Sequence, residues 1–205
     1  CEITIEANPA TIQQETLTQI RSAGFNRISI GVQSFDADEL KFLERVHNEK
    51  EIYTTIDRAR LAGFDNLSID LMFGLPNQSP KKWRSHLRQA VAKAPNHISA
   101  YSLTIEPATS FFKLQERGRL HLPAEDIQLE MFQETIETLQ AAGYEQYEIS
   151  NYAQPGFKSR HNLNYWDNGE YLGLGAGASS YINGERYKNT NLPASYIREV
   201  KTEGS

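Results

Sequence analysis

The sequence predicts an α/β protein in which helices alternate with parallel β-strands, and three observations support this fold class. A short phrase, a small residue and a glycine followed by an aromatic residue, occurs three times, beginning at Ala23, Ala62 and Ala142. In each copy the glycine can close a helix in the left-handed conformation, and a β-rich run follows. The copies recur at about forty and then about eighty residues, as serial βα units do. Such units place the ligand site at the carboxyl ends of their strands.

The individual elements follow from local patterns. Runs rich in Ile, Leu or Ser predict strands at residues 3–6, 27–32, 67–73 and 97–104. Amphipathic stretches predict the intervening helices at residues 12–23, 36–45, 49–62 and 80–94. Ser79 is expected to cap the last of these helices ahead of Pro80, and Thr11 is expected to cap the first, with Gln14 three residues on.

The pattern changes after Pro107, where we expect a domain boundary. A polar stretch at 110–123 contains Gly118 and precedes a long helix at about 124–142. We therefore expect an αβ domain at 1–123 and a C-terminal α+β extension at 124–205. The extension has a predicted strand at 147–152, the run HNLNYW at 161–166 and a glycine-rich piece at 173–178. That piece lacks the Lys-Ser/Thr of a phosphate loop, so close backbone packing is its expected role.

Composition bounds the class of protein. A chain of 205 residues with 39% hydrophobic content can bury one core with an appendage, but it is short for an eightfold barrel. The net charge of -5 without a basic cluster argues against a nucleic-acid partner, and no long apolar run predicts a membrane span. The single cysteine, Cys1, and the lack of a leader predict a cytoplasmic protein. Because the chain begins directly on a strand pattern, we expect it to be incomplete, with an open sheet edge that favours dimerisation or aggregation.

Polar residues stand where the predicted strands end. If the strands are parallel, one mouth of the sheet receives Glu6, Gln33, Asp70 and Thr104. Carboxylates accept hydrogen bonds from a ribose or an ammonium, and an amide both donates and accepts, so the ring suits a nucleoside. Arg45 follows Gln33 in the next helical stretch, and its guanidinium matches a carboxylate. On spacing alone, a surface arginine on an exposed helix face is the favoured interpretation of Arg45, because most arginines lie at the surface.

Four motifs occur in order along the chain: EANP at 6–9, GVQSF at 31–35, IDLMFGLP at 69–76 followed by Gln78, and YEISNYA at 147–153. They resemble the radical S-adenosylmethionine (SAM) proteins grouped with oxygen-independent coproporphyrinogen III oxidase, and the resemblance spans nearly the whole chain. The HNLNYW run resembles the haem chaperone branch of that group. The resemblance implies a partial (βα)6 radical SAM barrel, of which this chain holds the third to sixth strands.

The resemblance also implies cofactors. Its SAM-site positions match Glu6, Gln33, Arg45, Asp70 and Thr104. The intact protein would carry SAM and a 4Fe-4S cluster held by three cysteines in a C-x-x-x-C-x-x-C loop. That loop and the family's glycine-rich SAM-binding turn are absent from this chain, and one thiolate cannot hold a four-iron cluster. We therefore expect no catalytic residue and no metal ligand in this chain, and weak or no SAM binding by it alone.

His161 stands in a dense aromatic and amide setting. Its imidazole is a candidate axial ligand for haem iron, with Tyr165 and Trp166 offering flat contact to a porphyrin. In the alternative interpretation, His161 and Asn162 tie a corner to the barrel and Trp166 fills core. The other histidines have no partner at ligand spacing and are expected at the surface or at strand edges. They are His47, His86, His97 and His121.

Three functions follow as hypotheses. The first is a radical SAM haem chaperone that delivers haem to respiratory proteins, favoured by the HNLNYW run. The second is the oxidase itself, which decarboxylates two propionates of coproporphyrinogen III in haem biosynthesis, so the sequence leaves open whether the protein is an enzyme. The third is a barrel enzyme that acts on a nucleotide or sugar without iron.

Overall fold

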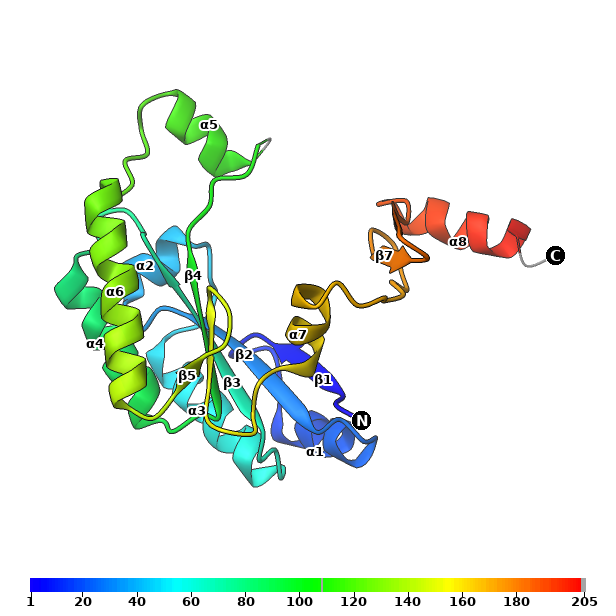
Figure 1. The fold of residues 1–205 in the computed structure, drawn as a ribbon, viewed down its shortest axis with the longest axis horizontal. Coiled ribbons are helices and arrows are strands. Elements are labelled where there is room, and N and C mark those ends of the chain that lie inside the picture. The colour runs from blue at the N-terminus through cyan, green and yellow to red at the C-terminus, as the bar shows by residue number, and fades with distance from the viewer. Residues whose placement is uncertain (108, 204–205) are drawn as a thin grey trace. The chain divides into compact units, whose positions relative to one another are not determined.

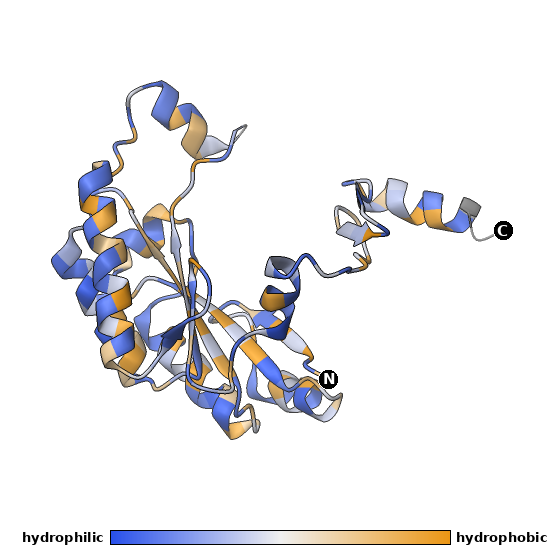
Figure 2. Cartoon of the chain, in the orientation of Figure 1, coloured by the Kyte–Doolittle hydropathy of each residue, from blue (hydrophilic) through white to orange (hydrophobic). Residues whose placement is uncertain are grey.

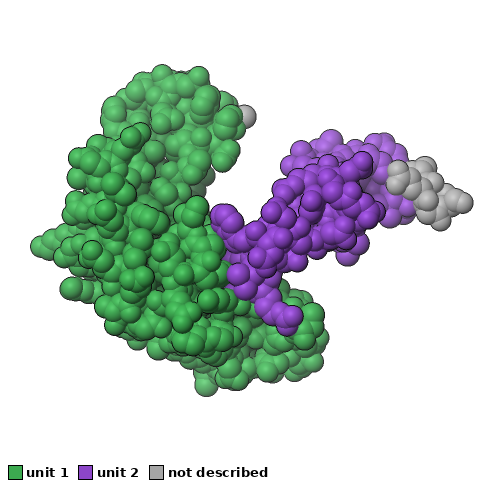
Figure 3. Space-filling view, viewed as in Figure 1, with its two compact units in different colours: residues 1–158 green, residues 159–205 purple. Residues whose placement is uncertain are grey.

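The computed structural model describes residues 1–107 and 109–203, which form two compact units. Unit 1 comprises residues 1–158 and unit 2 begins at Ser159 (Figure 3). The boundary therefore falls later than the expected division between residues 123 and 124. The reason is the long helix α6 (Glu125–Ala141), which packs on α4 (Pro80–Ala92) within unit 1.

Unit 1 is built on a six-stranded sheet (Figure 1). Its strands are β1 (Thr4–Ala7), β2 (Arg27–Gln33), β3 (Leu67–Phe73), β4 (His97–Ser102), β5 (Glu145–Gln146) and β6 (Asn151–Ala153). Their order is β1-β2-β3-β4-β6-β5; the first four are parallel, and β6 runs antiparallel to both β4 and β5. The predicted α/β class with parallel strands is confirmed. The expected strand at 147–152 is broken by a turn, because the Glu148 carboxylate accepts the Ser150 N–H at 3.1 Å.

The remaining helices of unit 1 are α1 (Gln14–Ser22), α2 (Ala37–Phe42), α3 (Glu49–Leu61) and α5 (Ser110–Glu116). Ser79 caps α4 by accepting the Lys82 N–H, as predicted. The predicted Thr11 cap is wrong: α1 begins after Gln13 without a side-chain cap, because the Thr11 hydroxyl donates to the Asn8 carbonyl instead. The polar stretch after Pro107 contains α5, whose first turn is capped by Thr109.

The hydrophobic core lies between one face of the sheet and helices α1, α3, α4 and α6. Alternate strand residues enter it, since successive side chains of a strand point to opposite faces. Figure 2 shows the resulting alternation of apolar and polar residues along the strands. The strand residues of the core are Ala7, Ile28, Ile30, Val32, Leu67, Ile69, Leu71, Phe73, Ile98, Ala100 and Tyr152. Trp83 joins α4 to α6, because its indole N–H donates to Thr135 Oγ1 at 2.8 Å and to the Met131 carbonyl at 3.1 Å.

Unit 2 contains helix α7 (Arg160–Trp166), the antiparallel hairpin β7 (Ser179–Ile182) and β8 (Glu185–Lys188), and helix α8 (Pro193–Glu203). Its glycine-rich piece packs backbone to backbone, as expected. A Cβ at Gly173 would lie 2.1 Å from the Ser179 carbonyl oxygen, and the Asn189 amide donates to the carbonyls of Gly173 and Gly175. Within the part of the chain that the structure describes, no helix combines the length and apolarity needed to cross a membrane.

Candidate functional site

The sheet face opposite the helices, here called the inner face, carries a polar network. The register aligns Ser29 with Ser68, Ser68 with His97, and Asp70 with Ser99 on neighbouring strands. Glu6, on the first strand β1, aligns with Ser29 on β2. Because register partners in a sheet point to the same side, these side chains share one face. On the opposite, helix-facing side of the same strands the side chains are apolar and buried in the core. The inner face is therefore the side that is equipped for polar contacts.

Asp70 is the centre of this network. The Ser29 hydroxyl lies 2.9 and 3.0 Å from its two carboxylate oxygens and donates to them. Burial raises the pKa of Asp70, and the nearby charge of Glu6 raises it further, whereas hydrogen bonds from Ser29 and Ser99 and the charge of Arg27 oppose the rise. Glu6 and Asp70 are therefore close enough for their charges to interact, but Asp70 lies in the middle of β3 and not at the carboxyl end of the strand, where the sequence analysis placed it.

Gln33 and Arg45 meet at the carboxyl end of β2 through a residue that sequence reasoning did not select, Asn8. Arg45 Nη1 donates to Asn8 Oδ1 at 3.0 Å. The amide of Gln33 and that of Asn8 both lie over Gly31, where a Cβ would be 3.1 Å from Gln33 Nε2 and 3.2 Å from Asn8 Oδ1. A glycine at this position therefore leaves room for two amide groups side by side.

A β-bulge explains how Gln33 reaches this corner. Ile30 pairs with Ile69 but Gln33 pairs with Leu71, so β2 has one extra residue relative to β3. Gln33 also has a φ of 65°, a left-handed conformation that is uncommon outside glycine. Bulges and strained backbone redirect side chains and concentrate at functional sites. The alternation of residue types along β2 gives no sign of this extra residue.

Thr104 is the member of the predicted ring that the structure does not join to the others. It is exposed and lies two positions beyond Ser102, the last residue of β4. Across residues 1–107 and 109–203, no hydrogen bond links Thr104 to Glu6, Gln33 or Arg45. The structure thus brings the predicted residues together as two pairs, Glu6 with Asp70, and Gln33 with Arg45 around Asn8, and leaves Thr104 apart from them.

The histidine expectation needs correction. His47, His86 and His97 are buried rather than at the surface, and each has a partner, whereas His121 is exposed. His97 Nδ1 lies 2.8 Å from the Ser68 hydroxyl and Nε2 lies 2.7 Å from the Tyr147 hydroxyl. Burial and the nearby charge of Arg27 lower the pKa of His97 to about 3, so its imidazole is neutral.

A buried carboxylate, Glu39, connects the segments behind the strand ends. Its Oε2 accepts from the Ser34 hydroxyl at 2.6 Å and from the Gln78 amide at 3.2 Å, and it lies 3.0 Å from His86 Nε2. Burial opposes ionisation, but the hydrogen bonds from His86 and Ser34 outweigh it and lower the pKa of Glu39. Gln78 Oε1 in turn accepts the N–H of Gly74, just after β3. Through Gln78, Glu39 therefore holds the loop that begins at Gly74, after strand β3.

In unit 2, the His161 run forms helix α7. His161 packs edge-on against Tyr165, with ring centroids 4.8 Å apart, as expected for residues four apart on a helix. Trp166 is 55% exposed, which differs from the interpretation in which it fills core. Helix α7 therefore presents aromatic surface around an imidazole.

The comparisons with known proteins agree with this geometry. The model of the radical SAM superfamily matches residues 1–90. The chain is 44% identical to the "Heme chaperone HemW" of Bacillus subtilis over 99% of the chain and 54% of that protein. It is 45% identical to the protein of the same name from Escherichia coli over 88% of the chain and 47% of that protein. The chain thus spans about half the length of the curated relatives it matches.

A solved structure extends the likeness to the fold. The E. coli coproporphyrinogen III oxidase HemN, described as a radical SAM enzyme, superposes with a TM-score of 0.81 and 26% identity, over 100% of this chain and 50% of that one. The predicted partial radical SAM barrel with a C-terminal α+β extension is confirmed by this match. The chain therefore belongs to the radical SAM superfamily, in the group that includes the haem chaperones named HemW and coproporphyrinogen III oxidase.

Proposed function

We propose that the protein of which this chain is a part is a radical SAM haem chaperone that binds haem and delivers it to respiratory haem proteins. The observation that carries the proposal is the 44% identity, over 99% of the chain, with a protein named as a haem chaperone. The HNLNYW run in α7 supports it from the sequence. A cytoplasmic location is part of the same proposal, supported by the use of a single cysteine in 205 residues.

The inner-face residues fit a SAM molecule by the chemistry of their groups. Glu6 and Asp70 offer carboxylates for a ribose diol or an ammonium, and Gln33 adds an amide beside the space that Gly31 leaves open. Arg45, already turned toward this corner by Asn8, offers a guanidinium for the carboxylate of SAM. We propose that these four residues, with Thr104 at the rim, bind and orient SAM.

The cluster has to be held by residues outside this chain. Among the described residues, no group of three or more His, Cys, Asp or Glu lies together as a metal ion would need. When bound, the cluster and SAM supply radical chemistry, and the protein supplies binding and orientation. The part played by this chain is positioning: its rigid parallel strands hold the polar groups in fixed relation to the nucleoside.

For haem, the proposed site is the exposed surface of α7. His161 would provide an axial nitrogen to the iron, and Tyr165 and Trp166 would provide flat apolar contact to the porphyrin. The 41% and 55% exposure of these two aromatic side chains leaves area that a porphyrin can cover.

The second candidate function is that of the oxidase, favoured by one observation: the fold match to coproporphyrinogen III oxidase covers the whole of this chain. An oxidase would use the same SAM positions but would bind a porphyrinogen instead of delivering haem. The two candidates therefore differ in what happens to the tetrapyrrole, not in how SAM is oriented.

The experiment that separates them uses the full-length protein, reconstituted anaerobically with iron, sulfide and SAM. Haem is titrated while the Soret band is followed, and coproporphyrinogen III is then supplied while mass spectrometry follows decarboxylation. A chaperone shows saturable haem binding and no divinyl product, and a His161→Ala variant changes the Soret spectrum whereas His121→Ala does not. Formation of the divinyl product would reject the chaperone proposal in favour of the oxidase.

A further inference from the structure

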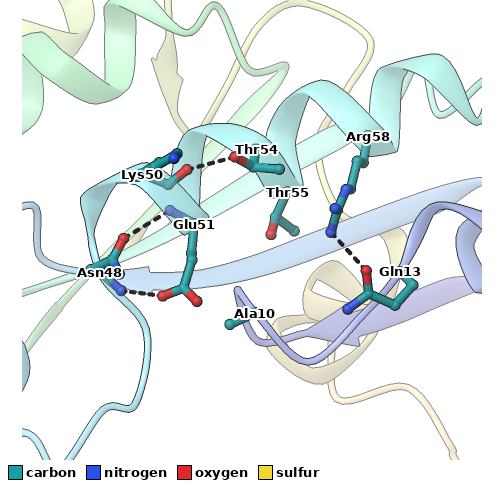
Figure 4. A pocket seen from close by; sticks show the side chains of 8 residues that line it. All are labelled: Ala10, Gln13, Asn48, Lys50, Glu51, Thr54, Thr55 and Arg58. Atoms are coloured by element: carbon teal, nitrogen blue, oxygen red, sulfur yellow. Dashed lines mark hydrogen bonds between the residues drawn. The ribbon is translucent and has the colours of Figure 1, made fainter.

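A pocket lies away from the inner face, between the loop that follows β1 and helix α3 (Figure 4). Its volume is about 360 Å³, within the range of small-molecule sites. Its lining residues are Ala10, Gln13, Asn48, Lys50, Glu51, Thr54, Thr55 and Arg58.

Thr55 marks the pocket as more than a surface hollow. Only 1% of this residue is exposed, and among the described residues its hydroxyl has no hydrogen-bond partner. Figure 4 shows the hydroxyl directed into the pocket, whereas the neighbouring Thr54 hydroxyl donates to the Lys50 carbonyl. A hydroxyl that faces the pocket without a protein partner is free to donate to, or accept from, a polar atom of a ligand.

The two ends of the pocket carry opposite charge. Glu51 and Arg58 are seven residues apart on α3, so they lie on the same side of the helix, about 10 Å apart along its axis. The Glu51 carboxylate accepts the Asn48 N–H at 2.8 Å, and Arg58 Nη1 donates to Gln13 Oε1 at 3.1 Å. Thr55 lies between them. Lys50, the other charged residue of the pocket, is exposed at the rim.

The floor of the pocket is held in an uncommon backbone conformation. Ala10 has a φ of 67°, in the left-handed region that residues with a Cβ seldom adopt. Such strain persists only where the surroundings enforce it, and it concentrates at binding sites. Ala10 directly follows the EANP segment that carries Glu6 and Asn8, but it lines this pocket beside α3.

We propose that this pocket binds a small zwitterion, with its ammonium group near Glu51, its carboxylate near Arg58 and the Gln13 amide, and a polar atom on Thr55. A simple anion would meet the charge of Glu51, and a simple cation would meet that of Arg58. A molecule with both charges, separated by a short chain, satisfies both ends without net charge. The site is independent of SAM and of haem.

The test uses full-length protein and ω-amino acids as probes. Binding of 6-aminohexanoate is followed by the NMR methyl signal of Thr55, beside hexanoate and hexylamine, which each match one end of the pocket. The expected result is saturable binding of 6-aminohexanoate, at least tenfold tighter than either comparator. A zwitterion that binds no better than hexanoate, or a Thr55 signal that does not saturate, would overturn the proposal.

Two variants distinguish a ligand contact from a structural role. Thr55→Val breaks no hydrogen bond within the described protein, so folding and SAM affinity should be retained while the dissociation constant of 6-aminohexanoate rises at least fivefold. Thr18→Val, on the exposed side of α1, is the matched control and should change nothing. Glu51→Gln keeps an acceptor for the cap of α3 but removes the charge, so hexanoate should then bind as well as the zwitterion. Unchanged affinity in Thr55→Val, or unchanged preference in Glu51→Gln, would contradict the proposed site.

Discussion

At the scale of single residues, the inner face holds charged groups in places where folding alone would not favour them. Asp70 is in the middle of a strand whose outer positions are fully buried, and burial raises the pKa of its carboxyl group. Ser29 compensates only in part, by donating to both of its oxygens. A carboxylate that costs stability in the absence of a ligand is typical of a binding site.

Asp70→Asn should therefore stabilise the protein and weaken SAM binding. In the folded chain the raised pKa favours the protonated carboxyl, so ionisation of Asp70 at higher pH favours unfolding. Asn keeps an acceptor for Ser29 without the charge, and we expect a gain of ~1 kcal/mol in the free energy of unfolding at pH 7. Urea unfolding at pH 7 measures this gain, which should shrink near pH 4. Asp57→Asn, on an exposed side of α3, is the control; a loss of stability in Asp70→Asn would contradict the argument.

His97 makes the stability of unit 1 sensitive to acid. Its pKa is lowered from 6.5 to about 3 by burial and by Arg27, so the folded state holds the neutral form. The stabilisation is complete above pH 6.5 and is lost as the pH falls toward 3. Within this window the slope for one proton is about 1.4 kcal/mol per pH unit.

His97→Gln should reduce the pH dependence of the free energy of unfolding by the amount that one proton contributes. It should also lower stability at pH 7, because the contacts with Ser68 and Tyr147 are altered. Chemical unfolding between pH 4 and 7 provides the measurement, with His121→Gln at an exposed position as the control. An identical slope in His97→Gln and the unsubstituted protein would show that another group is responsible.

At the scale of elements, the strand ends are held in place by contacts between segments far apart in the chain. Glu39 at the start of α2 joins Ser34 after β2, Gln78 after β3 and His86 in α4. Lys82, also in α4, makes a fourth contact, with its Nζ 3.3 Å from Glu39 Oε1. These contacts fix the loops that follow Gln33 and Asp70.

Removing this carboxylate should be strongly destabilising. Glu39→Ala leaves the Ser34 hydroxyl, the Gln78 amide and His86 buried without their acceptor, and we expect a loss of about 3 kcal/mol in the free energy of unfolding. Urea unfolding followed by circular dichroism measures it. Glu137→Ala, at an exposed position of α6, should stay within about 0.5 kcal/mol. If Glu39→Ala changed the free energy of unfolding as little as Glu137→Ala does, the network around Glu39 would contribute little to the stability of the fold.

At the scale of the whole molecule, the chain spans about half the length of its curated relatives, and it carries one part of the proposed SAM site. The polar groups of the inner face are proposed to orient the nucleoside of SAM, but the cysteines that would hold the cluster are not in this sequence. We expect the chain alone to show weak or no SAM binding in a calorimetric titration, and the reconstituted full-length protein to bind SAM. Tight binding by the chain alone would refute the view that the cluster-binding part is needed.

The sequence by itself determined the α/β class and the four parallel strands, because these features depend on local periodicity and on the alternation within strands. It placed Asp70 at the carboxyl end of its strand, whereas the register puts Asp70 in the middle of β3 on the same face as Glu6. Only the tertiary structure decided that a bulge turns Gln33 toward Asn8, that Glu39 meets His86, and that Thr55 opens into a pocket. These contacts join residues from different segments, and they follow from strand register and helix packing. Local pattern carries no information on either, so folding the whole chain was needed to bring these groups together.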